Sequence, residues 1–175
     1  SPEQASMGET SVDTRTDIYS LGAMLYALMT GVSPCDSDRF RQAGFDEVRR
    51  IVREDYPQRP SVKVLKRASL PTISGEEATT CRRLAKTLTG DLDCIIMKAI
   101  EKDRDRRYQT VNELVHDLKC YFSNEPIVAR APTLLYTLSK FARRRCGVLI
   151  SIVIAATCLL FGLAIAIVQA SRANR

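Results

Sequence analysis

Two long runs of uncharged residues limit what this chain can fold into. The first run covers eighteen residues from Ile18 to Cys35, and the second covers twenty-one from Val148 to Val168. A helix over the second run would be about 31 Å long, which matches the hydrocarbon core of a bilayer. The alternative is a buried core helix, but such helices are seldom apolar on every face over this length. We therefore predict a transmembrane helix over residues 148–168.

The first run differs because helix start and stop signals shorten it. Thr16 is the predicted N-cap, and Asp17 would lie in the first turn, where a carboxylate suits the positive end of a helix. Gly31 ends the helix after about fourteen residues, or about 21 Å, which is too short to cross a membrane. We therefore expect protein to surround it, and burial to contribute about 2 kcal/mol for each of Leu21, Leu25 and Leu28.

The net charge of +6 is concentrated around the second run. Residues 1–135 contain 20 basic and 20 acidic residues, and the excess comes from six later ones: Lys140, Arg143, Arg144, Arg145, Arg172 and Arg175. Basic residues at both ends of an apolar run are typical of a span that meets anionic lipid. The denser cluster precedes the span, which predicts that residues 1–147 are cytoplasmic. We expect the lipid bilayer as a partner and no nucleic acid.

The rest of the pattern predicts a mainly α fold followed by a single transmembrane helix. Thr110 and Glu113 form a capping box, residues 61–75 are expected to be irregular, and amphipathic helices are expected over 46–54, 76–88, 91–103 and 110–122. No segment shows the period of two that indicates a strand. The predicted organisation is a helical domain over 1–122, a linker over 123–133, a basic amphipathic juxtamembrane segment over 134–147, the span over 148–168, and a short tail over 169–175. A flexible tether is the alternative for 134–147.

Three short motifs occur in order along the first 122 residues. Ser1-Pro2-Glu3 resembles the A-P-E motif of protein kinases, and Asp17 to Gly22 ("DIYSLG") resembles their D-x-x-S-L-G helix start. Asp103 to Arg107 resembles the D-P-x-x-R loop, with Arg104 in place of proline. Together these motifs resemble the C-terminal half of the large lobe of a bacterial serine/threonine protein kinase. The helical domain would then be the distal part of that lobe.

The resemblance implies roles for three residues. Glu3 and Arg107 would form a buried ion pair that ties the end of the activation segment to the last helices, and Asp17 would accept hydrogen bonds from the backbone of the catalytic loop. The alternatives are two unrelated surface charges for Glu3 and Arg107, and an ordinary first-turn carboxylate for Asp17. The role of residues 61–90, which are long for this part of the family, stays open.

The residues that transfer phosphate in such kinases would lie before the A-P-E motif. We expect this chain to be the C-terminal part of a longer one, and ATP and Mg²⁺ to be bound by residues that precede it. His116 to Lys119 ("HDLK") resembles the kinase catalytic loop but lacks its arginine, and we interpret it as a solvated helix face. Asp103 and Asp105 are interpreted as surface carboxylates. The six cysteines form no C-x-x-C pair, so no metal site is predicted.

The resemblance implies a membrane-anchored serine/threonine kinase that transfers the γ-phosphoryl group of ATP to protein substrates. The chain alone should be inactive. Its location would be the bacterial cytoplasmic (inner) membrane, crossed once, with self-association through the span or the lobe as a further expectation. The alternative is a non-catalytic, membrane-tethered interaction module, like a pseudokinase.

Overall fold

The computed structural model describes residues 1–2, 14–35, 44–144, 151 and 154–162. Within these ranges the chain is helical and contains no strand, which confirms the mainly α prediction. The chain divides into two compact units, of which the first comprises residues 1–122 and 127–131 and the second comprises 123–126 and 132–175. Segment 127–131, predicted as part of a linker, is therefore part of the first unit.

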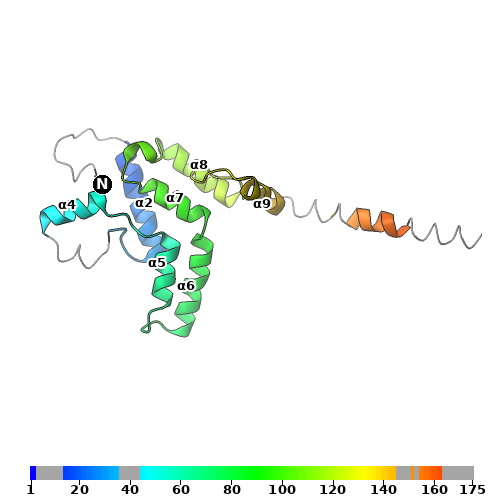
Figure 1. Ribbon diagram of the computed structural model, residues 1–175, viewed down its shortest axis with the longest axis horizontal. Coiled ribbons are helices and arrows are strands. Elements are labelled where there is room, and N and C mark those ends of the chain that lie inside the picture. The colour runs from blue at the N-terminus through cyan, green and yellow to red at the C-terminus, as the bar shows by residue number, and fades with distance from the viewer. Residues whose placement is uncertain (3–13, 36–43, 145–150, 152–153, 163–175) are drawn as a thin grey trace, which may run out of the picture. The chain divides into compact units, whose positions relative to one another are not determined.

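Helix α2 (Thr14–Thr30) runs through the first unit and contacts α5, α7 and α8 (Figure 1). It begins two residues before Thr16, so the predicted N-cap is wrong, because Thr16 already lies within the helix and is buried. The predicted stop is confirmed, since Gly31 follows with φ +76° and its N–H donates to Ala27 O at 2.8 Å. Glycine adopts this left-handed conformation without the steric cost of a Cβ atom.

One face of α2 is buried and the other is exposed. The buried residues are spaced mainly by four: Thr16, Ile18, Tyr19, Gly22, Tyr26 and Thr30. The expectation that Leu21, Leu25 and Leu28 would be buried is wrong, because Leu21 is 43% exposed, Leu28 is 74% exposed and Leu25 is half-buried. Met24, 61% exposed, lies on the same side. We call Leu21, Met24 and Leu28 the apolar flank of α2.

Two further helices stand side by side beyond α4 (Phe45–Glu54): α5 (Pro60–Ala68) and α6 (Gly75–Leu88) (Figure 1). The expectation that 61–75 is irregular is thus wrong for most of that segment. Pro60 is the first residue of α5, where its missing N–H would have no partner in any case. Ser74 caps α6 by accepting from the N–H of Glu77 at 3.3 Å. The two helices enclose a small core that includes Val64, Ala85 and Leu88.

Helix α7 (Asp91–Ala99) packs against α2 and leads through a 3₁₀ turn, η1 (Arg104–Arg106), to α8 (Val111–Phe122). The amphipathic helix expected over 91–103 is confirmed as far as Ala99, where it ends, and Ile95, Ile96 and Ala99 are fully buried. A buried hydrogen-bond pair links α7 to α5, because Asp93 accepts from both the N–H and the hydroxyl of Ser61. The α5–α6 pair is therefore attached to the body of the first unit at the start of α5.

The second unit includes helix α9 (Leu134–Arg144), which falls within the predicted juxtamembrane segment. Leu134, Leu135 and Leu138 are exposed, whereas Tyr136 and Lys140 are buried. Residues 154–162 are also helical. Among the residues that the structure describes, no helix has the length and apolar character needed to span a bilayer. Most of the predicted span, 148–150, 152–153 and 163–168, lies outside the described residues, so it stays a prediction.

Candidate functional site

Arg107 is the buried centre of the loop between α7 and α8. Its side chain is 2% exposed, although a guanidinium stays charged at any physiological pH. Nη2 donates to Lys102 O at 3.1 Å, Nη1 donates to Arg15 O at 3.2 Å, and Nε donates to Glu101 O. These bonds connect the loop after α7 to the start of α2, so one side chain fixes two segments.

The ring of Tyr19 covers the guanidinium from the α2 side. The Arg107 Cζ atom lies 5.0 Å from the ring centroid, and Tyr19 is itself buried. An arginine over an aromatic face is stabilised by the ring's negative face, and more so when water is excluded. This contact places the arginine against the first turns of α2, whose sequence includes the D-x-x-S-L-G motif.

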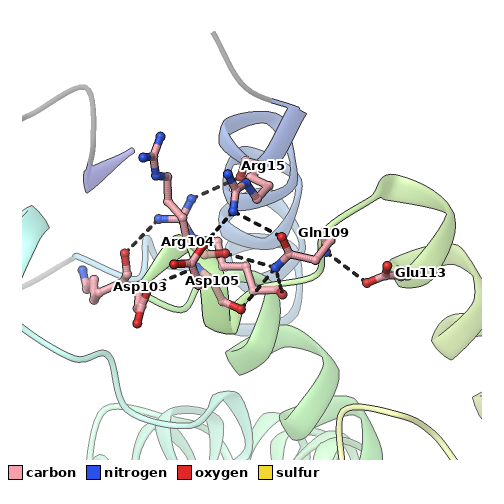
Figure 2. A network of polar contacts seen from close by, with 8 residues as sticks. Arg15, Asp103, Arg104, Asp105, Gln109 and Glu113 are labelled. Atoms are coloured by element: carbon pink, nitrogen blue, oxygen red, sulfur yellow. Dashed lines mark hydrogen bonds and ion pairs between the residues drawn. The ribbon is translucent and has the colours of Figure 1, made fainter. Parts of the chain in front are cut away.

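An outer ring of polar contacts surrounds this loop, as Figure 2 shows. Arg15 Nη1 donates to Asp105 Oδ1 at 2.9 Å and to Gln109 Oε1 at 3.2 Å. The Gln109 amide donates in turn to the carbonyls of Arg104, Asp105 and Arg107 at 3.0–3.4 Å. Exposed ion pairs contribute little individually. Their shared geometry nevertheless holds the loop to α2.

Local sequence explains the shape of the loop without the family's proline. Asp103 caps η1, because its carboxylate accepts from the N–H of Asp105 at 2.9 Å. The predicted capping box of α8 is half confirmed: Glu113 N–H donates to Thr110 Oγ1 at 3.2 Å, but the Glu113 carboxylate accepts from Gln109 N at 3.0 Å. The helix begins at Val111, as the box predicts, but the carboxylate reaches the residue before Thr110 and not Thr110 itself.

The predicted kinase-core residues occupy different settings. Glu3 lies outside the described residues, so its ion pair with Arg107 stays a prediction. Asp17 lies in the first turn of α2 and is exposed. Asp105, interpreted as a surface carboxylate, is indeed exposed and ion-paired with Arg15.

The predicted membrane-flanking residues are described only in part. Lys140, on α9, is buried, with its Nζ 5.8 Å from the centroid of the Tyr136 ring. Arg143 and Arg144 belong to α9, and Arg145 lies outside the described residues.

Asp117 is a second buried charged residue, and sequence reasoning missed it. The interpretation of His116 to Lys119 as a solvated face is wrong for Asp117, whose side chain is fully buried, although His116 and Lys119 are exposed. The carboxylate accepts from the Tyr108 hydroxyl and from the N–H groups of Val128 and Ala129, each at 2.8 Å. Burial and the Asp117 carboxylate raise the pKa of Tyr108, which keeps its hydroxyl a donor.

Lys102 belongs to the same loop and connects it to α4. Its Nζ donates to Val52 O, at the end of α4. Burial, the largest cause, lowers the pKa of this amine. The loop that contains Arg107 is therefore tied to α4 as well as to α2. In the described part of the chain, no group of three or more His, Cys, Asp or Glu side chains could hold a metal ion.

Comparison with known proteins places this arrangement in a family, although no family model matches the chain. The chain is 33% identical over 131 residues to a probable serine/threonine-protein kinase of Streptomyces coelicolor. It is 34% identical over 119 residues to a probable serine/threonine-protein kinase of Clostridium perfringens. It is 35% identical over 126 residues to the serine/threonine-protein kinase PknB of Mycobacterium tuberculosis.

These matches cover 68–75% of this chain but only 13–16% of the relatives. Together, the fold and the comparisons define the class of protein: the chain is a helical segment of a protein kinase. Over the matched residues the chain belongs to the bacterial serine/threonine protein kinase family, which confirms the resemblance that the three motifs indicated.

Proposed function

We propose that this chain is the distal part of the large lobe of a membrane-anchored serine/threonine protein kinase. The whole enzyme would transfer the γ-phosphoryl group of ATP to serine and threonine hydroxyls of protein substrates. The observation that carries this proposal is the buried Arg107, at the position of the family's loop arginine, in a chain whose curated relatives are kinases by name. Those relatives extend well beyond the matched segment, which leaves room for a catalytic half.

The Arg107 loop would organise the activation segment rather than perform chemistry. A carboxylate at Glu3 would complete the shell around the guanidinium, and the strong preference of buried arginine for a bidentate carboxylate supports this pairing. Asp17, exposed in the first turn of α2, is available to accept hydrogen bonds from a catalytic loop supplied by the preceding sequence.

The apolar flank of α2 supports a larger lobe. Leu21, Met24 and Leu28 expose apolar surface on one side of a helix whose other side is well packed. A contiguous exposed patch of this kind marks a surface that another segment covers. The residues that would bind ATP and Mg²⁺ are proposed to lie in that preceding part, because the phosphate-binding and metal-binding motifs of such kinases come before the A-P-E motif.

Phosphotransfer tests the proposal directly. The reading frame would be extended upstream, the longer protein purified, and transfer of ³²P from [γ-³²P]ATP to protein serine and threonine measured. We expect activity in the wild type, and a reduction of at least about tenfold in Asp17→Asn, because an amide both loses charge and presents a donor to the catalytic-loop N–H groups. Arg106→Ala, which changes an exposed residue of η1, should retain activity. A folded but inactive wild type would favour the interaction module instead.

Membrane anchoring needs a separate experiment. The chain and a variant without residues 148–168 would be expressed, and the membrane fraction washed with alkaline carbonate. We expect only the chain that contains the uncharged run to stay in the pellet, with residues 1–147 open to protease in inverted vesicles. Release of both proteins by carbonate would disprove the anchor while leaving the kinase proposal intact.

A further inference from the structure

A hollow of about 730 Å³ lies in the first unit where α2, α4 and α5 meet. Such a volume is within the range of about 300–1,000 Å³ that is typical of ligand sites. Tyr26 and Thr30 contribute from the C-terminal half of α2, Ile51 from α4, and α5 forms one wall. Much of that wall comes from the part of the chain, 61–90, whose role the sequence left open.

Hydrogen bonds hold the walls of the hollow in place. The Tyr26 hydroxyl donates to Gln58 O at 3.0 Å, which fixes the segment between α4 and α5. Thr30 Oγ1 lies 2.9 Å from both Tyr26 O and Val32 O, which fixes the segment after α2. Burial raises the pKa of Tyr26 to about 12, so its hydroxyl remains a donor at neutral pH. A wall of this kind is largely formed before any ligand arrives.

The charged lining of the hollow is mainly positive. Lys63, Lys66 and Arg67 line it at i, i+3 and i+4 of α5, a spacing that places them on one side of the helix, and Asp55 is the one acidic residue of the lining. Arg67 is bridged to Glu77 at 2.9 Å. For Lys63 and Lys66, no carboxylate of the described residues lies within ion-pair distance. Two cations are therefore available to an acidic ligand.

The rim of the hollow has the composition of a protein-binding surface. Tyr56 is 66% exposed and Leu70 is 52% exposed, and both contribute to the lining. Large exposed apolar residues beside arginine are typical of protein interfaces, in which tyrosine and arginine often dominate the binding energy. An open hollow with such a rim is better suited to a peptide than to a small molecule that must be enclosed.

From these contacts we propose that the hollow between α2, α4 and α5 is a docking site for an acidic segment of a partner protein. Carboxylates of the segment would pair with Lys63 and Lys66, and an apolar side chain would lie against Tyr56 and Leu70. This inference does not depend on phosphoryl transfer, so a failed kinase assay would leave it standing.

Peptide binding tests the site. The 175-residue chain would be placed in phosphatidylcholine nanodiscs and titrated with fluorescein-labelled hexapeptide pools that combine Glu with Leu or Phe. The matched pools replace Glu by Gln. We expect the acidic pools to bind at least about tenfold more tightly than the amide pools, with the difference shrinking as salt is added. Equal binding of the two pools would overturn the proposal.

A pair of charge-reversal variants locates the interaction. Lys63→Glu with Lys66→Glu should weaken binding of the acidic pools by about tenfold or more. Arg82→Glu with Arg83→Glu makes the same change of net charge on exposed positions of α6 outside the hollow, and should preserve binding within about twofold. Equal losses in both variants would show non-specific attraction to a basic protein. Both variants should unfold at the wild-type urea concentration.

Two further readouts identify the place and the class of partner. Cys35 lines the hollow, whereas Cys81 on α6 does not, and both are partly exposed. An acidic peptide should slow alkylation of Cys35 severalfold and leave Cys81 unchanged in residue-resolved mass spectrometry; protection of neither would overturn the proposal. Binding to phosphatidylserine nanodiscs that depends on Lys63 and Lys66, without binding of acidic peptide, would reassign the site to lipid.

Discussion

At the residue scale, buried charges hold the first unit together by acting on main-chain groups. Arg107 donates to carbonyls of Arg15, Glu101 and Lys102, and Asp117 accepts from the N–H groups of Val128 and Ala129. Each bond is charge-assisted and therefore stronger than a neutral one. The partners at Glu101, Lys102, Val128 and Ala129 lie in loops, where no regular helix pairs them, and Arg15 lies in the first turn of α2.

Loss of the Arg107 guanidinium should be costly. Arg107→Met leaves three carbonyls without their donor in a dry site, and we expect the free energy of unfolding to fall by about 3 kcal/mol. Arg107→Lys keeps the charge but offers no planar fork, so it should recover less than half of that loss. Urea denaturation of the chain in nanodiscs measures both. Arg106→Met, at an exposed position, is the matched control and should change stability by less than about 0.5 kcal/mol.

Asp117 should control the segment that follows α8. In Asp117→Asn one of the three donors meets an amide N–H₂ instead of a carboxylate oxygen, which costs about 1–3 kcal/mol. We expect amide hydrogens of Val128 and Ala129 to exchange at least about tenfold faster, while α7 remains protected. Hydrogen exchange with mass spectrometry provides the measurement, and His116→Asn on the exposed side of α8 is the control. Unchanged exchange at 128–129 would contradict the role of this carboxylate.

Tyr26 should make stability fall in alkali. Its pKa is raised from 10.0 to about 12, mainly by burial, so the native state favours the neutral phenol. The contribution of Tyr26 to the free energy of unfolding is then complete below about pH 10. It falls by about 2 kcal/mol in total as the pH rises towards 12. Tyr26→Phe lacks this titration. The difference in unfolding free energy between the two proteins should therefore narrow between about pH 9 and 12, and a constant difference would contradict the assignment.

At the element scale, the sequence predicted helices better than it predicted their partners. Apolar spacing was sufficient for α6 and α7, and Gly31 marked the end of α2 correctly. Helix α5 was not predicted, because residues 61–75 were expected to be irregular, although Pro60 is well suited to the first turn of a helix. The burial of Asp117 could not be predicted, because its three donors come from residues 108, 128 and 129 and meet only in the folded chain.

The crossing of α2 and α7 depends on Gly22, the glycine of the D-x-x-S-L-G motif. A Cβ atom there would lie 2.7 Å from Ala99 Cβ and 2.9 Å from Ile100 Cγ2, which is closer than real contacts allow. Gly22→Ala should therefore destabilise the chain by about 1–3 kcal/mol, even though alanine favours helix by nearly 1 kcal/mol. Gly75→Ala, where nothing lies within 4 Å, is the control and should be neutral or stabilising in the same urea experiment.

At the scale of the whole molecule, α2 of the first unit is packed on one side and exposes an apolar flank on the other. Helices α5, α7 and α8 contact α2, and the apolar flank lies on the side that they leave open. A run that is uncharged all round predicts burial on every face. The sequence therefore did not distinguish the packed side of α2 from the exposed side. The chain covers only 15–16% of these relatives, and we propose that a preceding segment covers the flank.

The apolar flank therefore leads to a prediction that differs between the 175-residue chain and the upstream-extended protein. Met24→Glu with Leu28→Glu alters side chains that are 61% and 74% exposed, so the unfolding free energy of the 175-residue chain should change by less than about 0.5 kcal/mol. In the upstream-extended protein the same substitutions would bury two carboxylates, and we expect a loss of at least about 4 kcal/mol or failure to fold. Phe122→Glu, exposed on α8, is the control and should be tolerated in both proteins. Equal effects of the double substitution in the two contexts would mean that no upstream segment covers this face, because only new burial can turn a tolerated carboxylate into a destabilising one.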